Sequence, residues 1–357
     1  MPTPEPSLPE ALDRQIVACE RLGSPQYADL FRKLAADYHA HGLTWELLHD
    51  RPELPLRDAL LLRYVGSVHR IVLRGDAPRL ADHYPSAGGD GSPVPLDEFL
   101  DVVRSHRDEV VAALSQQVQT NEVGRCAALI LGFAEVARRT GLPLNMLEIG
   151  ASAGLISNWD RYWYDTGSST AGDPASAVRL TGRWQDPYDL SGLTPVARRA
   201  GCDISPLDPT NEENRRRLLG FVWPDQRERS ELLEGALRIA DAHPTKVHAI
   251  DAGAFLAREL PARPGGTATI VFHSIVWQYL PKESKVLARR VLRDEGTRAG
   301  ADRPIAWVRL EPSGEWADVR LTLWPGGSEE LLAVGSHHGA GLARPSDGRT
   351  AARHAGV

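Results

Sequence analysis

A glycine-rich turn near the middle of the chain carries the strongest chemical signal. Residues 148–154 read Glu-Ile-Gly-Ala-Ser-Ala-Gly and follow a short apolar run that begins at Met146. Small residues let the backbone of such a turn approach a ligand, and a helix that starts there offers unpaired N–H groups. The sequence therefore predicts a cofactor-binding turn. Its binding residues are expected to be Glu148, Gly150, Ala151, Ser152 and Gly154.

Two later segments end in a carboxylate, as further strands of the same sheet would. Asp203 closes a second expected strand, and Asp251 with Ala252 closes a third. In nucleoside-binding sheets a carboxylate at the second strand accepts hydrogen bonds from the ribose hydroxyls. An acid followed by a small residue suits the amino group of adenine. The three strand ends together predict a nucleoside site.

Each of these acids also has a structural interpretation. Asp203 precedes Ile-Ser-Pro, where an acid caps a turn. Asp208 competes as the ribose ligand, although Thr210 and Glu213 favour a capping box beside it. We favour Asp203 for the ribose. For Asp251, both a contact with adenine and a plain helix cap remain possible roles.

The elements that must position these residues fall into two parts. Up to about residue 143, apolar residues recur at helical spacing and no strand pattern is visible. This part is expected to be a helical domain or cap, residues 1–143, with Asn121 capping its last helix. The predicted helices span residues 8–22, 27–39, 56–73, 96–118 and 122–140.

After Pro143 the pattern changes to short apolar runs that alternate with helix-like stretches. The last two runs leave no room for a helix between them, which indicates an antiparallel hairpin. We predict an α/β domain over residues 144–340, with a Rossmann-like, mainly parallel sheet and this hairpin at its end. Residues 341–357 are expected to form a disordered tail. The predicted strands span residues 145–149, 246–251, 267–276, 304–310, 319–324 and 331–334.

This order of strands is similar to that of class I S-adenosylmethionine-dependent methyltransferases. Several segments more specifically resemble a bacterial family of unknown function, domain-of-unknown-function family 2332. The resemblance to this family covers residues 15 to 340 and implies the fold but no established reaction. S-adenosylmethionine as cofactor is what the similarity to the methyltransferases implies. Beyond Gly339 the family pattern would continue with an aromatic strand that this chain lacks. The matching segments are residues 84–89, 120–125, 147–154, 206–210, 222–226, 272–281 and 323–327.

The resemblance also indicates where the reaction would occur. In methyltransferase-like sheets the fourth strand ends facing the transferred group, so His273 is a candidate general base. A core histidine bonded to backbone is the alternative. Tyr279 is the second catalytic candidate, as part of a substrate wall, or else a core aromatic. Asn121, Glu122 and Arg125 form either a polar cluster over the pocket or helix capping with a surface ion pair.

Two features depart from the methyltransferase pattern. Ser152 stands where the central glycine of the turn is usual. Asp203 follows Gly150 at far more than the ~20 residues of an ordinary dinucleotide-binding unit, so an insertion must intervene. The insertion is rich in Trp and Tyr, which could wall a substrate pocket.

Two other functions remain open. A catalytically silent, nucleoside-sensing module would share the fold without the reaction. Residues 150–154 also match the nucleophile elbow of α/β-hydrolases, with Ser152, Asp251 and His337 in triad order. The helices expected before the turn oppose that interpretation, because an elbow follows several strands.

Composition narrows the class of protein. The net charge of −6 argues against a nucleic-acid binder, and the longest apolar run is far too short to cross a membrane. Cys19, Cys126 and Cys202 lie far apart among apolar residues, as reduced thiols of a cytoplasmic protein do. The pair His337-His338 lacks further ligands at metal spacing, so no metal is expected. We expect a cytoplasmic protein that acts on a small molecule, with neither a nucleic-acid nor a membrane partner.

Overall fold

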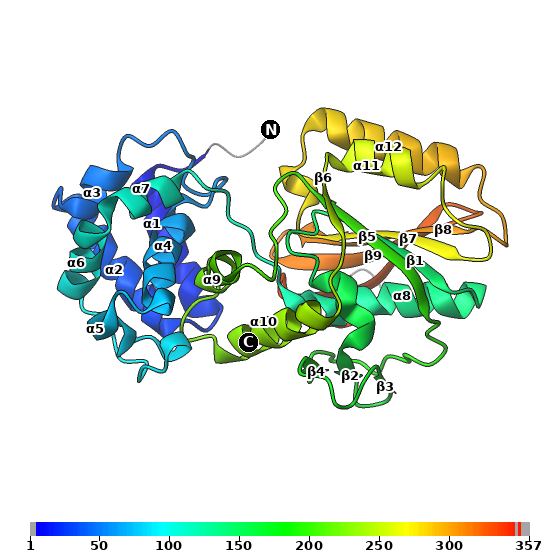
Figure 1. The fold of residues 1–357 in the computed structure, drawn as a ribbon, viewed down its shortest axis with the longest axis horizontal. Helices are drawn as coiled ribbons and strands as arrows, with labels where there is room; N and C mark the ends of the chain where they lie inside the picture. Colours follow the sequence, from blue (N-terminus) through cyan, green and yellow to red (C-terminus); the bar gives the residue numbers. More distant parts are fainter. Residues whose placement is uncertain (1–4, 347–348, 351–357) are drawn as a thin grey trace. The chain divides into compact units, whose positions relative to one another are not determined.

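The structure is a computed structural model that describes residues 5–346 and 349–350. The chain divides into two compact units (Figure 1). Unit 1 contains Met1–Thr120 and Asn211–Glu231, and unit 2 contains Asn121–Thr210 and Leu232–Val357. This division differs from the boundary expected at residue 143, because the last predicted helix belongs with the sheet and a later segment belongs with unit 1.

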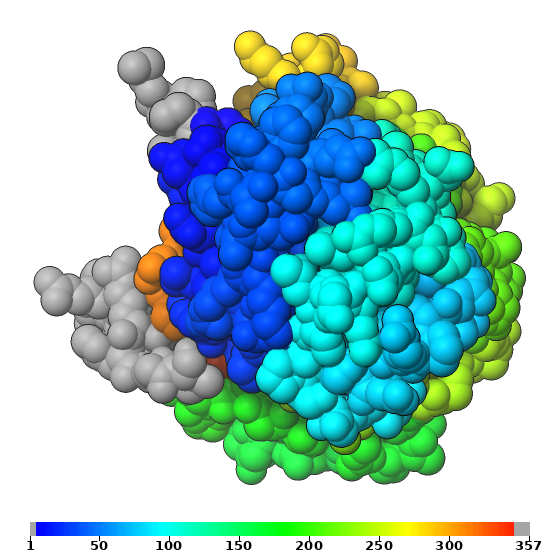
Figure 2. Space-filling view, turned by 90° about the vertical axis from the view of Figure 1, so that its left-hand side faces the viewer, coloured from blue at the N-terminus to red at the C-terminus, as the bar shows by residue number. Residues whose placement is uncertain are grey.

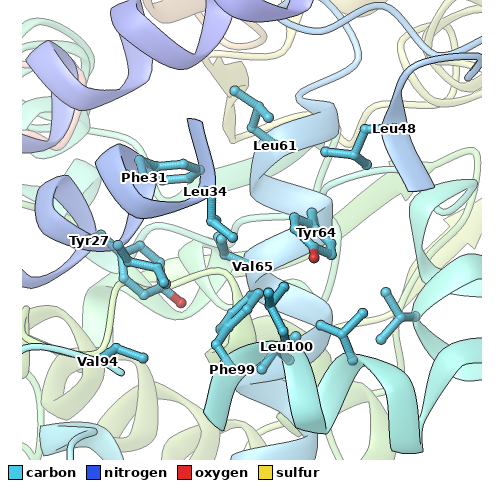
Figure 3. Packing of buried hydrophobic residues seen from close by; sticks show 14 of the residues in the cluster. Tyr27, Phe31, Leu34, Leu48, Leu61, Tyr64, Val65, Val94, Phe99 and Leu100 are labelled. Atoms are coloured by element: carbon cyan, nitrogen blue, oxygen red, sulfur yellow. The ribbon is translucent and has the colours of Figure 1, made fainter. Parts of the chain in front are cut away.

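Unit 1 is helical, as the apolar spacing predicted. Large side chains such as Tyr27, Phe31, Tyr64 and Phe99 fill its core (Figure 3). Figure 2 shows the surface that the blue and cyan residues of this unit form. The single helix expected over residues 96–118 is two helices that meet at His106. The helices are α1 (Leu8–Arg21), α2 (Pro25–His39), α3 (Leu43–Leu48), α4 (Leu60–Arg74), α5 (Pro78–Ala81), α6 (Leu96–Ser105), α7 (Arg107–Leu114) and α9 (Glu212–Gly220), with a 3-10 turn at Pro85–Ala87.

The segment 211–231 joins unit 1 through one carboxylate and one aromatic ring. Asp225 accepts hydrogen bonds from Ser24 Oγ (2.6 Å) and Gln26 N (3.1 Å) at the start of α2. The ring of Trp223 packs against that of Tyr27 at 6.4 Å. Both contacts involve the family segment 222–226, whose role in this unit is therefore structural.

Unit 2 is built on a seven-stranded sheet in the order β10-β9-β8-β7-β1-β5-β6. The five strands from β8 to β6 are parallel, while β9 is antiparallel to both β8 and β10. The predicted α/β class and terminal hairpin are thus confirmed, and a second tight connection joins β8 to β9. The strands are β1 (Leu144–Ile149), β5 (Val196–Asp203), β6 (Val247–Ala249), β7 (Ala268–Ser274), β8 (Ile305–Ser313), β9 (Trp316–Trp324) and β10 (Ser328–Gly335).

Helices cover both faces of this sheet (Figure 1). On one face α8 (Cys126–Thr140) packs through Phe133 on Phe272, with ring centroids 5.1 Å apart. On the other face α11 (Ala252–Glu259) and α12 (Lys282–Gly296) bury Phe255 and Leu292. Among the described residues, no helix combines the length and apolar character that crossing a membrane requires.

The remaining elements are short and lie outside the main sheet. Helix α10 (Arg227–Ala242) begins among the residues of unit 1 and ends among those of unit 2. Leu342 and Ala343, inside the expected tail, are buried and pair with Trp184 and Val334. Residues 347–348 and 351–357 of that tail lie outside the described residues. The short strands are β2 (Trp163–Asp165), β3 (Thr170–Ala171), β4 (Arg179–Thr181), β11 (Pro345–Ser346) and β12 (Arg349–Thr350).

The contact between α8 and the sheet can be tested at Gly132. A Cβ atom there would lie 2.6 Å from Val308 Cγ1 in β8, so α8 approaches the sheet more closely than alanine allows. Although alanine favours a helix over glycine by about 1 kcal/mol, we expect Gly132→Ala to lower the free energy of unfolding by about 1–3 kcal/mol through overpacking.

Val308→Ala supplies the matched test in urea unfolding. Because it removes the clashing methyl groups, it should cost clearly less in the Gly132→Ala protein than in the wild type. Equal costs in both backgrounds would contradict the close approach of α8 to β8.

Candidate functional site

The turn after β1 adopts a backbone conformation that only small residues accept readily. Gly150, Ser152 and Gly154 all have positive φ, at 67°, 51° and 72°. A Cβ atom at Gly150 would lie 2.4 Å from Val276 Cγ2 in the loop after β7. The glycine is therefore required both for its φ and for the contact between these two loops.

The N–H groups of this turn are largely bonded within the protein. Ser152 Oγ is buried and makes no hydrogen bond to any residue that the structure describes. For a ligand, the turn therefore offers few donors beyond this hydroxyl and the N–H of Ala153. The four internal bonds run from Ala151 N to Cys202 O (2.9 Å), from Ser152 N to Asp203 Oδ2 (3.0 Å), from Gly154 N to Ala151 O (2.7 Å) and from Leu155 N to Asn121 Oδ1 (2.8 Å).

Asn121 fixes both ends of the turn. Its Oδ1 accepts from Leu155 N, and its Nδ2 donates to Ala151 O at 3.2 Å. The prediction that Asn121 caps a helix is wrong, because Glu122 occupies the capping position of the short 3-10 turn before α8. No local spacing could have revealed this contact, since it joins residues about thirty positions apart.

Glu122 and Arg125 are buried at the same edge, where the strands end at their carboxyl termini. Arg125 donates from Nε to His337 O (3.0 Å) and from a terminal nitrogen to Ser274 O (3.3 Å). Glu122 Oε2 lies 3.2 Å from Nδ1 of His338. Glu122 and Arg125 are thus joined to the ends of β7 and β10. The expected capping holds in part, because Glu122 Oε1 accepts from Gly124 N, whereas the burial of both side chains excludes a surface ion pair. A polar cluster over the pocket stays a prediction.

Glu148 is the last but one residue of β1 and is buried. Ser157 Oγ donates to its Oε2 at 2.5 Å. Burial raises the pKa of the Glu148 carboxyl to about 8, against the smaller effect of the Ser157 bond, and the nearby charge of Asp203 raises it further. At neutral pH this side chain is therefore mainly a neutral acid.

Asp203 lies beside the turn, as the sequence predicted for the second strand end. Its Oδ2 accepts from Ser152 N, and its Oδ1 accepts from Ser205 N at 2.9 Å. Asp208 is exposed and accepts from the N–H and the hydroxyl of Thr210. The capping box expected at Thr210 is wrong by one residue, because Asn211 caps α9.

Asp251 occupies the N-terminus of α11, directly before the buried Ala252. Its Oδ1 accepts from Gly253 N (2.8 Å) and Ala254 N (3.2 Å). The helix-cap interpretation is therefore confirmed. Because the cap engages one carboxylate oxygen, the adenine contact stays a prediction beside it.

His273 lies near the end of β7 and is completely buried. Its Nδ1 is 2.6 Å from Glu311 Oε1, so its partner is a carboxylate and the backbone bond expected of a core histidine is not what holds it. Ile275, two residues on, has a φ of 51°, which is an outlier for a β-branched residue. Tyr279, by contrast, is 64% exposed on the loop that follows.

The aromatic residues of the insertion are mostly structural. Tyr162 and Tyr164 are buried, and their hydroxyls donate to Leu155 O (2.5 Å) and Trp159 O (2.8 Å). Trp159 itself packs on Phe133 of α8. These side chains support the segment after the turn, and their burial leaves them no surface with which to wall a substrate pocket.

The surroundings of Ser152 do not fit the catalytic triad of a hydrolase. Ser152 Oγ has no hydrogen-bond partner among the described residues, so no histidine is set to activate it. Asp251 is engaged in its helix cap. Among the described residues, no group of three or more His, Cys, Asp and Glu side chains could hold a metal ion.

The comparisons with known proteins identify the family. A family model described as an uncharacterized protein conserved in bacteria (DUF2332) matches residues 9–344. The chain therefore belongs to this family, as its motifs predicted. No curated protein and no solved structure gave a match.

The buried acid predicts a pH dependence of stability. The folded protein keeps Glu148 protonated up to about pH 8, whereas the ordinary pKa is 4.5. The free energy of unfolding of the wild type should therefore fall as the pH rises between these values, by about 3 kcal/mol at pH 7. Glu148→Gln lacks this dependence, so it should gain stability over the wild type with rising pH.

Urea unfolding at a series of pH values measures the difference. Glu283→Gln, at an exposed position of α12, is the matched control and should follow the wild type. A constant difference between Glu148→Gln and the wild type would show that Glu148 is ionised in the folded protein.

Proposed function

We propose that this member of the family binds S-adenosylmethionine at the carboxyl edge of the unit 2 sheet and transfers its methyl group to a small molecule. The strands β6-β5-β1-β7-β8 follow the 3-2-1-4-5 order of doubly wound, Rossmann-like sheets. Such sheets bind ligands outside the carboxyl ends of the strands where the order reverses, which here is between β1 and β7. The strained turns at Ser152 and Ile275 follow these two strands.

The hydrogen bonds of the turn favour a nucleoside without phosphates over a dinucleotide as the ligand. A dinucleotide places its pyrophosphate on the free N–H groups of the turn and of the helix that follows. Here four of those groups already donate to protein acceptors, and the turn leads into a short 3-10 segment, Ile156–Arg161. A nucleoside without phosphates needs close backbone approach, which the turn supplies, and a carboxylate, which Asp203 supplies beside it.

The carboxylates keep enough acceptor capacity for this role. An ionised carboxylate has about four lone-pair sites on its two oxygens. Asp203 uses its oxygens for Ser152 N and Ser205 N, which leaves sites for the ribose hydroxyls. Asp251 uses one oxygen in the helix cap and could accept from the adenine amino group with the other, above the small Ala252.

The chemistry demanded of the protein is modest. A sulfonium methyl group is already activated, so the protein has mainly to hold an acceptor in line with it. His273 and Tyr279 are the side chains proposed to act beside the acceptor. The complete burial of His273 also favours a second candidate, a catalytically silent module that binds the nucleoside without turnover. Formation of S-adenosylhomocysteine in the presence of candidate acceptors separates the two.

Calorimetry with S-adenosylmethionine and S-adenosylhomocysteine tests the proposed ligand. The wild type should bind both, and Asp203→Asn should bind at least tenfold more weakly, because it loses the charge while its amide oxygen can still accept from Ser152 N. Asp208→Asn, in the same loop, should bind like the wild type. Absence of binding by the wild type, or equal effects of both variants, would exclude this site.

A second titration tests the exclusion of phosphates. Because the N–H groups of the turn are occupied, NAD⁺ should bind more weakly than S-adenosylhomocysteine by two orders of magnitude or more, on the order of 3 kcal/mol. Tighter binding of NAD⁺ would mean that the turn opens to accept a pyrophosphate.

A further inference from the structure

One carboxylate organises the loop after β7, and the sequence patterns did not single it out. Glu311 Oε1 accepts from Val276 N (3.1 Å) and Trp277 N (3.2 Å), in addition to its contact with His273. Burial of Glu311 raises its pKa, but the bond from His273 and the two backbone bonds outweigh this and hold the pKa below its ordinary value. Glu311 on β8 is therefore an ionised acceptor for the N–H groups of this loop.

This contact determines which nitrogen of His273 carries hydrogen. A carboxylate can only accept, so Nδ1 of His273 must donate to it. In the neutral imidazole, Nε2 is then left with a bare lone pair. A carboxylate bonded to one ring nitrogen and a bare lone pair on the other is the arrangement of an oriented base.

The lone pair of Nε2 has no partner in the protein. The atom is buried and makes no hydrogen bond to a described residue. The ring of Trp277 stacks on the imidazole at 5.1 Å with an interplanar angle of 18°, and Trp307 lies at 5.8 Å. A buried acceptor without a donor is costly to the folded protein, and in native structures it points to a ligand or a reaction.

We infer that Glu311 and His273 form a carboxylate–imidazole dyad that takes the proton of the methyl acceptor, with Glu311 as its positioning residue. This inference rests on the proposed function. As the acceptor atom bonds to the methyl carbon, the carbon–sulfur bond breaks and its electron pair stays on sulfur. The proton of the acceptor passes to Nε2 of His273, and the imidazolium is stabilised by the Glu311 carboxylate.

The loop after β7 covers the dyad and is bonded to it. The ring of Trp277 stacks on His273, and the backbone N–H of Trp277 donates to Glu311. Ile275 enters this loop in a strained conformation. The loop after β7 therefore covers one face of the His273 ring and bears the exposed Tyr279 at its end.

A pair of ligands tests the dyad without a known acceptor. Sinefungin replaces the methyl-bearing sulfonium of S-adenosylmethionine by a carbon that carries an amino group, which would donate to Nε2 of His273 across the empty acceptor site. Calorimetry gives the ratio of its affinity to that of S-adenosylhomocysteine, which lacks any donor there. The wild type should prefer sinefungin by about tenfold or more, as a charge-assisted hydrogen bond requires.

His273→Gln and Glu311→Gln should bring this ratio close to one and leave binding of S-adenosylhomocysteine within about threefold of the wild type. Glu329→Gln, which removes a partner of Arg309 and Arg320 on the same sheet, is the matched control and should keep the preference. Using both dyad variants guards against loss of folding in one of them.

The outcomes separate the two proposals. Binding of both ligands with a ratio that neither dyad variant changes would contradict the dyad and leave the proposed function standing. Failure of the wild type to bind either ligand would contradict the proposed function, and the dyad with it.

Discussion

The two hydrogen bonds of the Asn121 side chain are the contact on which the candidate site depends. They join the start of unit 2 to both ends of the turn after β1, and all three groups are buried. Without this amide, the buried Leu155 N would lose its partner inside the protein, which costs about 1–3 kcal/mol, and Ala151 O would keep only the bond from Gly154 N. The conformation of the turn, and with it the positions of Ser152 and Asp203, follows from this closure.

The same edge concentrates the strain of unit 2. Two non-glycine residues of this unit have positive φ in the described structure, Ser152 and Ile275. They follow adjacent strands, and the loops that contain them touch where Val276 packs over Gly150. Backbone strain of this kind persists where the surrounding contacts enforce it, and it gathers at functional sites. Asn121 and Asp203 enforce the first turn, and Glu311 enforces the second.

The sequence predicted the parts of the fold that depend on local pattern. Helical spacing in unit 1 and the alternation of strands and helices in unit 2 follow from which faces are buried, so they are readable residue by residue. The hydrogen bonds of Asp225 to the start of α2 could not be predicted, because no residue near Asp225 in the chain indicates them. The β8–β9 hairpin was missed because β9 begins three residues before its predicted start, close behind β8.

In the candidate site too, the sequence identified residues at strand ends but not the residues that they contact. Glu148, Asp203 and His273 were identified because strand ends in a parallel sheet share one edge. Ser157, the partner of Glu148, lies in the 3-10 segment Ile156–Arg161, and Glu311, the partner of His273, lies on a neighbouring strand. Asn121, which holds the turn beside Asp203, lies before the start of α8, and sequence spacing reveals none of these contacts. Asp251 could be interpreted in two ways because a helix cap and a ligand contact need the same residue at the same position.

The most direct measurement is a crystal structure of the protein soaked with S-adenosylhomocysteine. We expect the ribose hydroxyls at Asp203, the adenine beside Asp251, and the turn of residues 150–154 unchanged with its four internal bonds intact. A ligand bound elsewhere, or a turn that opens so that its N–H groups face the ligand, would contradict the proposal that this edge is a phosphate-free nucleoside site.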